Sequence, residues 1–268
     1  MRQVNIFFRK FVTGLAGSIL PVFLFSFLLA APGEKGIFAV ASADTLQSGP
    51  DQVSLLELYT SEGCSSCPSA DRMISELKSS PGLWNRIVPV AFHVDYWDYL
   101  GWVDRMANKE YGERQRDYIR QWNGRSTYTP MLVNNGEEFR RDTISQKPET
   151  DVGYLSVEQD APGEFMVVFR PSERFQNPHW RLETALLGFG ISSKVATGEN
   201  AGKVLAHDFT VLDHQVKDAV LADGKVQSLF SIDLRSSLKT SRLGLAAWVH
   251  PEDDLRPVQA VGGWLSVE

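Results

Sequence analysis

Hydrophobic and polar segments alternate in the first half of the chain in a way that predicts strands and helices in turn. A polar stretch, residues 44–52, leads into the apolar run 53–60, which indicates a buried strand. Residues 68–79 carry apolar side chains at helical spacing, and the apolar run 87–94 indicates a second strand. The order strand, helix, strand predicts a parallel pair of strands with a crossover through the helix.

The next two predicted elements are a charged helix and a hairpin. Residues 107–122 carry an aromatic stripe among charged residues, which is typical of a helix with one buried face. Residues 129–133 and 137–140 flank Asn134-Asn135-Gly136, a sequence that favours a tight turn between two antiparallel strands.

Beyond residue 150 the pattern changes to short strand-like runs separated by turn residues. The runs cover residues 164–170, 181–190, 204–212, 225–234, 243–249 and 257–265. No helical pattern separates them, which is typical of an antiparallel sandwich. We therefore predict an α/β domain over residues 44–150, followed by an antiparallel β-sandwich-like domain over residues 151–268. The boundary is expected in the polar stretch 142–153.

The N-terminal segment has the features of an export signal. Basic residues at positions 2, 9 and 10 precede an uncharged run, residues 11–31, and Ala41-Ser42-Ala43 offers a cleavage site before Asp44. We expect residues 1–43 to be a signal peptide. The alternative is a retained N-terminal membrane anchor, since the apolar run approaches the ~20 residues that span a bilayer. Both alternatives predict an exported protein, periplasmic or secreted, that contacts the membrane only if this segment is retained.

Charge and cysteine content argue against two classes of protein. The formal net charge of the 268 residues is −6 with no basic cluster, which argues against nucleic acid as a partner. The chain has only two cysteines. They lie three positions apart, and a disulfide between them would contribute only about 2 kcal/mol through chain entropy. The sequence therefore argues against a protein stabilised by a disulfide framework.

The two cysteines form the motif Cys64-Ser65-Ser66-Cys67, directly between the predicted strand 53–60 and the predicted helix 68–79. The free amides and partial positive charge of a helix N-terminus stabilise a thiolate at Cys64, and the pair can close into a small ring. This position predicts a redox-active dithiol/disulfide site.

Two further features are expected to serve this site. Thr129-Pro130 opens the third predicted strand, where a proline cannot donate to the sheet. A cis peptide bond at Pro130 would turn the backbone of Thr129 toward the sulfurs. Glu57 is a polar residue within the first buried strand, and a carboxyl beneath the pair would relay a proton from Cys67.

Aromatic residues and a histidine follow the second strand and leave alternatives open. We expect Tyr96 and Trp97 either to line a substrate groove with Thr129 or to pack against neighbouring elements. A metal site is an alternative to redox chemistry, with His93 joining Cys64 and Cys67 as a ligand. An inert structural disulfide is the third possibility.

The sequence around these residues resembles a known family. The order of elements around the Cys pair resembles the thioredoxin fold, and residues 57–68, 93–102, 128–130 and 198–202 are more specific. Together they resemble the DUF1223 family of exported bacterial thioredoxin-like proteins, which carries a β-rich C-terminal domain. The resemblance implies an α/β thioredoxin-like domain, Cys64 as the exposed nucleophilic thiol, Cys67 as the resolving thiol, and Pro130 as the cis proline that shapes the substrate groove.

These observations predict an exported thiol-disulfide oxidoreductase or redox relay that uses Cys64 and Cys67. The expected partner is a protein or a small thiol or disulfide, and no organic cofactor is implied. Two hypotheses compete with this one. The first is a copper- or zinc-binding metallochaperone or sensor, and the second is an adaptor that only presents the β-rich domain.

Overall fold

The computed structural model describes residues 45–139, 148–175, 177–235 and 238–266. The expected signal segment 1–43 and residues 142–147 of the expected boundary lie outside these ranges. The chain from Ala41 to Glu268 forms one compact unit. Within the described ranges, no helix is both long enough and apolar enough to cross a membrane.

The elements predicted in the first half are present. β2 (Ser54–Thr60), α1 (Cys67–Glu76) and β3 (Ile87–His93) follow one another, and β2 and β3 pair in parallel, as predicted. α1 continues into the short 3₁₀ helix η1 (Leu77–Ser79). The predicted charged helix is α2 (Lys109–Gln121), which begins after Asn108, whose side chain accepts a hydrogen bond from the Glu110 N–H.

The predicted hairpin is also present. β4 (Met131–Asn134) and β5 (Glu137–Glu138) are antiparallel and are joined by Asn135 and Gly136. Both turn residues have positive φ, 50° and 79°, which a two-residue type I′ turn requires. β4 pairs with β2, so that β2 lies between β3 and β4. The 3₁₀ helix η2 (Asp98–Leu100) lies in the connection between β3 and α2.

The described part of the chain beyond residue 150 contributes strands and no helix. They are β6 (Gly153–Ala161), β7 (Glu164–Pro171), β8 (His179–Phe189), β9 (Ile191–Lys194), β10 (Val204–His207), β11 (Thr210–Val220), β12 (Val226–Ser231), β13 (Arg242–Pro251) and β14 (Gln259–Trp264). The short strand β1 (Thr45–Gln47) precedes β2 and pairs with β6. The sequence pattern did not predict β1, β6 or β9, and it merged β10 with the start of β11.

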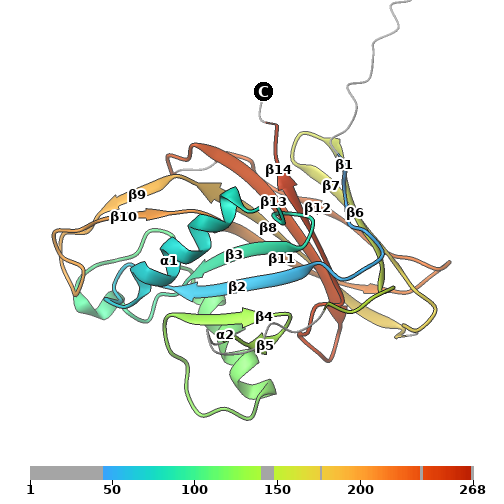
Figure 1. Ribbon diagram of the computed structural model, residues 1–268, viewed down its shortest axis with the longest axis horizontal. Coiled ribbons are helices and arrows are strands. Elements are labelled where there is room, and N and C mark those ends of the chain that lie inside the picture. Colours follow the sequence, from blue (N-terminus) through green and yellow to red (C-terminus); the bar gives the residue numbers. More distant parts are fainter. Residues whose placement is uncertain (1–44, 140–147, 176, 236–237, 267–268) are drawn as a thin grey trace, which may run out of the picture. The chain divides into compact units, whose positions relative to one another are not determined.

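The strands form three sheets. The largest has eight strands in the order β14-β13-β8-β11-β3-β2-β4-β5, the second has the order β1-β6-β7-β12, and β9 pairs with β10 in the third. In the eight-stranded sheet β3 is parallel to β2 and to β11, and the other pairs are antiparallel. Figure 1 shows β2 and β3 running alongside β11, β8 and β13.

The predicted fold class is therefore wrong. We expected an α/β thioredoxin-like domain followed by an antiparallel β-sandwich-like domain. The described chain is instead mostly β-sheet, with two α-helices and a large mixed sheet that contains strands from both halves. The physical reason is that β11 joins the edge of β3, at Thr210 opposite Ala91, and carries β8, β13 and β14 with it.

The eight-stranded sheet is buried on both faces where β8 and β13 run. Leu182 and Leu186 of β8 pack into a core with the four-stranded sheet, whereas Ala185 and Leu187 pack into a second core with β2, β3 and the helices. Every residue of β8 from Leu182 to Phe189 is buried. A strand buried on both faces carries a continuous apolar run instead of an alternating one, which is the pattern of residues 185–189, whereas the buried Glu183 is paired with Arg114.

α1 and α2 lie on opposite faces of β2. Thr60 contacts Asp71 on α1, whereas Glu57 contacts Arg114 on α2. Side chains three positions apart on a strand point to opposite faces, so these contacts place one helix on each side. In Figure 1, α1 lies between the β2–β3 pair and the β9–β10 hairpin.

Candidate functional site

The two cysteines form a disulfide at the start of α1. Ser66 is the N-cap residue, so Cys67 is the first residue of the helix and Pro68 the second. The Cα atoms of Cys64 and Cys67 are 5.5 Å apart, within the usual range for a disulfide. The predicted position of the pair, between a strand and a helix N-terminus, is confirmed.

Both cysteines are buried in this disulfide form. Cys64 is 1% exposed and Cys67 is 0% exposed, so the expectation of an exposed Cys64 is wrong for this state. Cys64 Sγ lies 3.3 Å from Ser66 Oγ and 3.7 Å from the Thr129 carbonyl oxygen. A reagent can reach this sulfur only when neighbouring groups move.

The Thr129–Pro130 peptide bond is cis, as predicted, and it lies beside the disulfide. The Thr129 carbonyl faces Cys64 Sγ, and Thr129 Oγ1 accepts a hydrogen bond of 2.7 Å from Trp97 Nε1. Trp97 also packs against Gly63, where an added Cβ would come within 2.8 Å of Trp97 Cβ, so this position requires glycine. The structure thus brings Thr129, Pro130 and Trp97 together at Cys64.

Tyr96 lies next to this group and is tied to α2. Its hydroxyl donates to Gln115 Oε1 over 3.2 Å, and its ring centroid is 6.5 Å from that of Trp97. Gln115 in turn donates to the Tyr128 carbonyl oxygen over 2.8 Å. Tyr96 and Trp97 are half-buried, so they pack against neighbouring elements and also present part of their surface near the disulfide.

Glu57 does not lie beneath the cysteines. It is fully buried on the face of β2 that α2 covers, where it accepts hydrogen bonds from Arg114, Tyr59 and Tyr118. α1, which begins at the disulfide, covers the other face of β2, where the Thr60 side chain contacts Asp71. The predicted proton relay through Glu57 therefore lacks the geometry that it needs.

A buried carboxylate–histidine pair lies on the disulfide side of the sheet. His93 Nδ1 donates to Asp104 Oδ2 over 2.7 Å, and the Glu62 backbone N–H donates to the same oxygen over 2.9 Å. Burial opposes charge on both groups, but their mutual attraction prevails: the pKa of His93 is raised, and the pKa of Asp104 is lowered to about 2. Each group thus favours the charged form of the other.

A second carboxylate–histidine pair adjoins the first. His207 Nε2 lies 3.2 Å from Glu62 Oε1, and Trp102 Nε1 donates to Glu62 Oε2 over 2.7 Å. Burial raises the pKa of Glu62, but the hydrogen bonds, led by that from His207, bring it below its usual value. The rings of His93 and His207 are 4.9 Å apart.

Asp71 completes this buried cluster from α1. Its Oδ1 accepts from Thr60 Oγ1 over 2.9 Å, and its Oδ2 lies 3.9 Å from His207 Nδ1. Burial raises the pKa of Asp71, and the nearby histidines His207 and His93 only partly offset this effect. Asp71 can therefore take up a proton more readily than an exposed aspartate, close to the first turn of α1.

The loop between β9 and β10 holds the backbone of the Cys motif. Asn200 is fully buried, and its Nδ2 donates to the carbonyl oxygens of Cys64, over 2.9 Å, and Glu62, over 2.8 Å. Glu199 Oε2 accepts from the Ser65 backbone N–H over 3.0 Å. Residues more than 130 positions later in the sequence thus fix the conformation of the motif.

The alternative metal site does not form in the described part of the chain. No group of three or more histidine, cysteine, aspartate or glutamate side chains is arranged there to hold a metal ion. His93 Nδ1 is hydrogen-bonded to Asp104, and the two cysteines are bonded to each other. The set Cys64, Cys67 and His93 is therefore not assembled as ligands.

Sequence reasoning missed Glu62, Asp71, Asp104 and His207 as members of the site. A signal was present for Asp71, because it follows Cys67 by four positions and so lies on the same helix face. Glu62 precedes Cys64 by two positions. No local signal links His207 to Glu62, which is 145 positions away.

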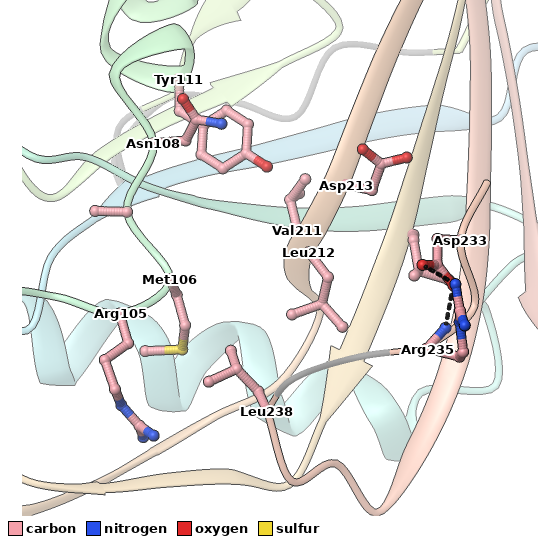
Figure 2. Close-up of a pocket in the computed structure, with 12 residues that line it drawn as sticks. Arg105, Met106, Asn108, Tyr111, Val211, Leu212, Asp213, Asp233, Arg235 and Leu238 are labelled. Carbon is pink, nitrogen blue, oxygen red and sulfur yellow. Dashed lines mark hydrogen bonds and ion pairs between the residues drawn. The ribbon is translucent and has the colours of Figure 1, made fainter. Parts of the chain in front are cut away.

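A separate cavity of about 230 Å³ lies at the start of α2. Figure 2 shows Asn108 and Tyr111 on one side of it and Asp213 on another, with an ion pair between Asp233 and Arg235. Neither cysteine is among its lining residues. The cavity is therefore distinct from the disulfide site.

Comparisons with known proteins indicate a family and a fold. A family model described as "Protein of unknown function (DUF1223)" matches residues 55–250. No curated protein matches the sequence significantly. Two solved structures are similar. Protein AGR_C_4864 from Agrobacterium tumefaciens is 20% identical, with 82% of this chain and 99% of that chain covered and a TM-score of 0.55. HBP35 of Porphyromonas gingivalis is 15% identical, with 81% and 76% covered and a TM-score of 0.58. At these identities the likeness concerns the fold alone.

Proposed function

Because the chain belongs to the DUF1223 family, whose description gives no function, we propose a function from the site: an exported thiol-disulfide oxidoreductase or redox relay that uses Cys64 and Cys67. One observation carries the proposal. The disulfide lies at the N-terminus of α1, with the Thr129 carbonyl oxygen 3.7 Å from Cys64 Sγ. A helix N-terminus lowers the cost of a thiolate, which is the species that attacks a disulfide.

The proposed roles follow from these positions. Cys64 is the nucleophile, since it has the Thr129 carbonyl and the Ser66 hydroxyl as neighbours, and Cys67 is the resolving thiol within the helix. Thr129 and Pro130 hold the partner's backbone beside the sulfurs, and Tyr96 and Trp97 form the rim on one side of it. The buried state of Cys64 requires local opening before exchange.

The partner and the location follow from the chemistry and from the N-terminus. The partner is a protein or a small molecule with a thiol or a disulfide, and the exchange needs no organic cofactor because the cysteine pair carries both electrons. The net charge of −6 makes a nucleic-acid partner unfavourable. Export rests on the signal-like residues 1–43, and mass determination of the mature N-terminus from a native source tests it.

A glutathione redox titration of the chain from residue 44 tests the proposed activity. Thiols are counted by alkylation and mass spectrometry at each ratio of reduced to oxidised glutathione. A midpoint between about −120 and −270 mV places the pair among exchange catalysts. A midpoint below about −300 mV identifies a structural disulfide and overturns the proposal.

A trapping experiment tests the assignment of the two cysteines. Cys67→Ala should leave mixed disulfides on Cys64 after incubation with an extract of the exported protein fraction, and these adducts should disappear on reduction. The matched control is Cys64→Ala, which leaves only the fully buried Cys67. Equal trapping by both variants would contradict the assignment of Cys64 as the nucleophile.

A further inference from the structure

The N-terminus of α1 receives a carboxylate from a distant part of the chain. The first turn of α1 contains no acidic residue, and the Ser66 side chain makes no capping hydrogen bond. Ser65, the residue before the N-cap, donates its N–H to Glu199 Oε2 over 3.0 Å, although Glu199 lies 134 positions later. An acidic side chain in this place interacts favourably with the positive end of the helix dipole.

Neighbouring contacts fix the position of Glu199. The adjacent Asn200 is fully buried and donates to the carbonyl oxygens of Cys64 and Glu62. Thr197 Oγ1 donates to the Gly101 carbonyl oxygen over 2.6 Å on the other side of Glu199. The carboxylate is therefore held at the Cys motif by anchors on both sides.

Glu199 is also charged under the conditions in which thiol exchange takes place. Its hydrogen bonds with Ser65 lower its pKa below the usual range. Ser65 lies directly between Cys64 and Ser66 in the motif, so the negative charge is next to the residue whose sulfur becomes anionic on reduction. A carboxylate thus lies at the residue before the N-cap of α1, close to the positive helix end that favours a Cys64 thiolate.

We propose that Glu199 is a positioning residue that tunes the Cys64–Cys67 pair toward the disulfide, because its carboxylate at the α1 N-terminus disfavours the Cys64 thiolate. The inference rests on the proposed function and names a residue that regulates the same site. In the oxidised form the sulfurs are neutral and the carboxylate is stabilised by the helix. In the reduced form the carboxylate and the thiolate repel each other.

The redox step that Glu199 would bias is exchange with glutathione. Two glutathione thiols reduce the Cys64–Cys67 bond: that S–S bond breaks, and the S–S bond of oxidised glutathione forms. Two electrons pass to the protein, and the two thiol protons are transferred to the Cys64 and Cys67 sulfurs or, for a Cys64 thiolate, to solvent.

The test compares Glu199→Gln with Glu76→Gln by glutathione titration of the chain from residue 44. Glu199→Gln removes the charge but keeps an oxygen that can accept from Ser65. Glu76 is the last residue of the same helix, exposed and ~14 Å along the axis from Cys67, so its variant makes the same charge change at the opposite end. Thermal unfolding of both variants confirms that they fold.

Glu199→Gln is expected to favour the reduced form by about two- to fivefold in the equilibrium constant. This change corresponds to a midpoint about 10 to 20 mV less negative. Because Glu199 is exposed, the difference should shrink between 20 and 500 mM salt, whereas a merely structural effect would not. Glu76→Gln should leave the midpoint unchanged.

The outcomes separate the inference from the proposed function. A wild-type midpoint in the exchange range, with Glu199→Gln equal to Glu76→Gln, overturns the inference and leaves the proposed function intact. A wild-type midpoint below about −300 mV overturns the proposed function, whatever the midpoints of the two variants. A shift toward the disulfide in Glu199→Gln would also overturn the inference, because the sign is opposite.

Discussion

Asp71 lies one helical turn after Cys67 on the buried face of α1, and its carboxyl accepts a hydrogen bond from Thr60. Helical side chains point back toward the N-terminus, so the Asp71 carboxyl extends toward the turn that contains Cys67. Burial raises its pKa. Asp71 is therefore a buried carboxyl on the same helix face as the resolving thiol, on the side of the sheet opposite Glu57.

Asp71→Asn is therefore expected to slow the resolving step. Cys67 must lose a proton before it attacks the mixed disulfide on Cys64, and removal of a positioned base typically costs about 100-fold or more in rate. The glutathione adduct on Cys64 should persist correspondingly longer at pH 7. Acid quenching followed by mass spectrometry measures its decay after reduced protein is mixed with oxidised glutathione.

The pH dependence and a control identify the role of Asp71. Wild-type resolution should slow as pH falls through the raised pKa of Asp71, because the protonated carboxyl cannot accept a proton. Asp71→Asn should lose this dependence.

Asp71→Asn should also fold, since a raised carboxyl pKa means that the ionised form destabilises the folded state at neutral pH. Asp117→Asn, on the exposed side of α2, is the control. Equal adduct lifetimes in the two variants would contradict the role of Asp71.

Glu57→Ala is expected to destabilise the fold without changing the chemistry of the disulfide. Arg114 lies between Glu57 and Glu183, with ion-pair distances of 2.9 and 2.8 Å, and all three side chains are buried. Arg114 keeps Glu183 as an ion-pair partner, but Arg114, Tyr59 and Tyr118 lose their shared buried acceptor, and each buried donor left unsatisfied costs about 1–3 kcal/mol. Urea unfolding measures the loss.

The control for Glu57→Ala removes an exposed acid of α2. Glu113 pairs with Arg116 on the surface, and Glu113→Ala should leave the free energy of unfolding nearly unchanged. The redox midpoint of Glu57→Ala should equal that of the wild-type protein. A variant of normal stability with slow thiol exchange would instead support the proton relay that the sequence suggested.

The sequence predicts local elements well because their signals are local. Residues 53–60, 68–79 and 87–94 carry their own strand and helix periodicities, and β2, α1 and β3 follow them. The position of the cysteine pair also follows from local sequence, because it needs only the residues between one strand and one helix. The cis bond before Pro130 was implied by the resemblance to the DUF1223 family.

The fold class was not predictable in this way, because the sequence of a strand does not specify which other strands it pairs with. β8 and β13 carry near-continuous apolar runs, since both of their faces are buried. Such a run fits the middle of a separate sandwich as well as the extension of the β2–β3 sheet. Only the pairing of Thr210 with Ala91 decides between them, and it joins residues far apart in sequence.

The Glu57 prediction failed for a related reason. Alternation along β2 shows that Glu57 and Thr60 point to opposite faces. It does not show which face α1 covers. The structure places α1 on the face of Thr60, so the acid that α1 brings to β2 is Asp71, and Glu57 faces α2.

The His93–Asp104 pair predicts a defined pH window of stabilisation. The lowered pKa of Asp104, about 2, contributes stability that is present above the unfolded value of about 3.9 and is lost as pH falls toward 2. The raised pKa of His93 contributes stability that is fully present below about 6.5 and is lost as pH rises through the folded value. The pair therefore stabilises most between about pH 4 and 6.5.

Comparison of the wild-type protein with Asp104→Asn tests this pH window. The difference in free energy of unfolding between wild type and variant should be largest near pH 5 and smaller at pH 3 and pH 9, as determined by urea unfolding. Asp117→Asn, which removes an exposed acid, provides the baseline. A difference that does not vary with pH would mean that Asp104 acts only through its neutral hydrogen bonds.

Asn200→Ala is expected to make the disulfide more accessible. Asn200 donates two buried hydrogen bonds, to the carbonyl oxygens of Cys64 and Glu62, and each contributes about 0.5–1.5 kcal/mol. Their loss should ease local opening by about 1–3 kcal/mol, which corresponds to roughly 5- to 150-fold faster reduction by dithiothreitol when opening limits the reaction. Timed alkylation measures this rate. Lys203→Ala is the control, since it removes a hydrogen bond to Asn200 Oδ1 in the same loop and keeps the two bonds from Asn200 Nδ2. If Asn200→Ala unfolds more easily but is reduced at the wild-type rate, the loop supports the fold without limiting access to Cys64.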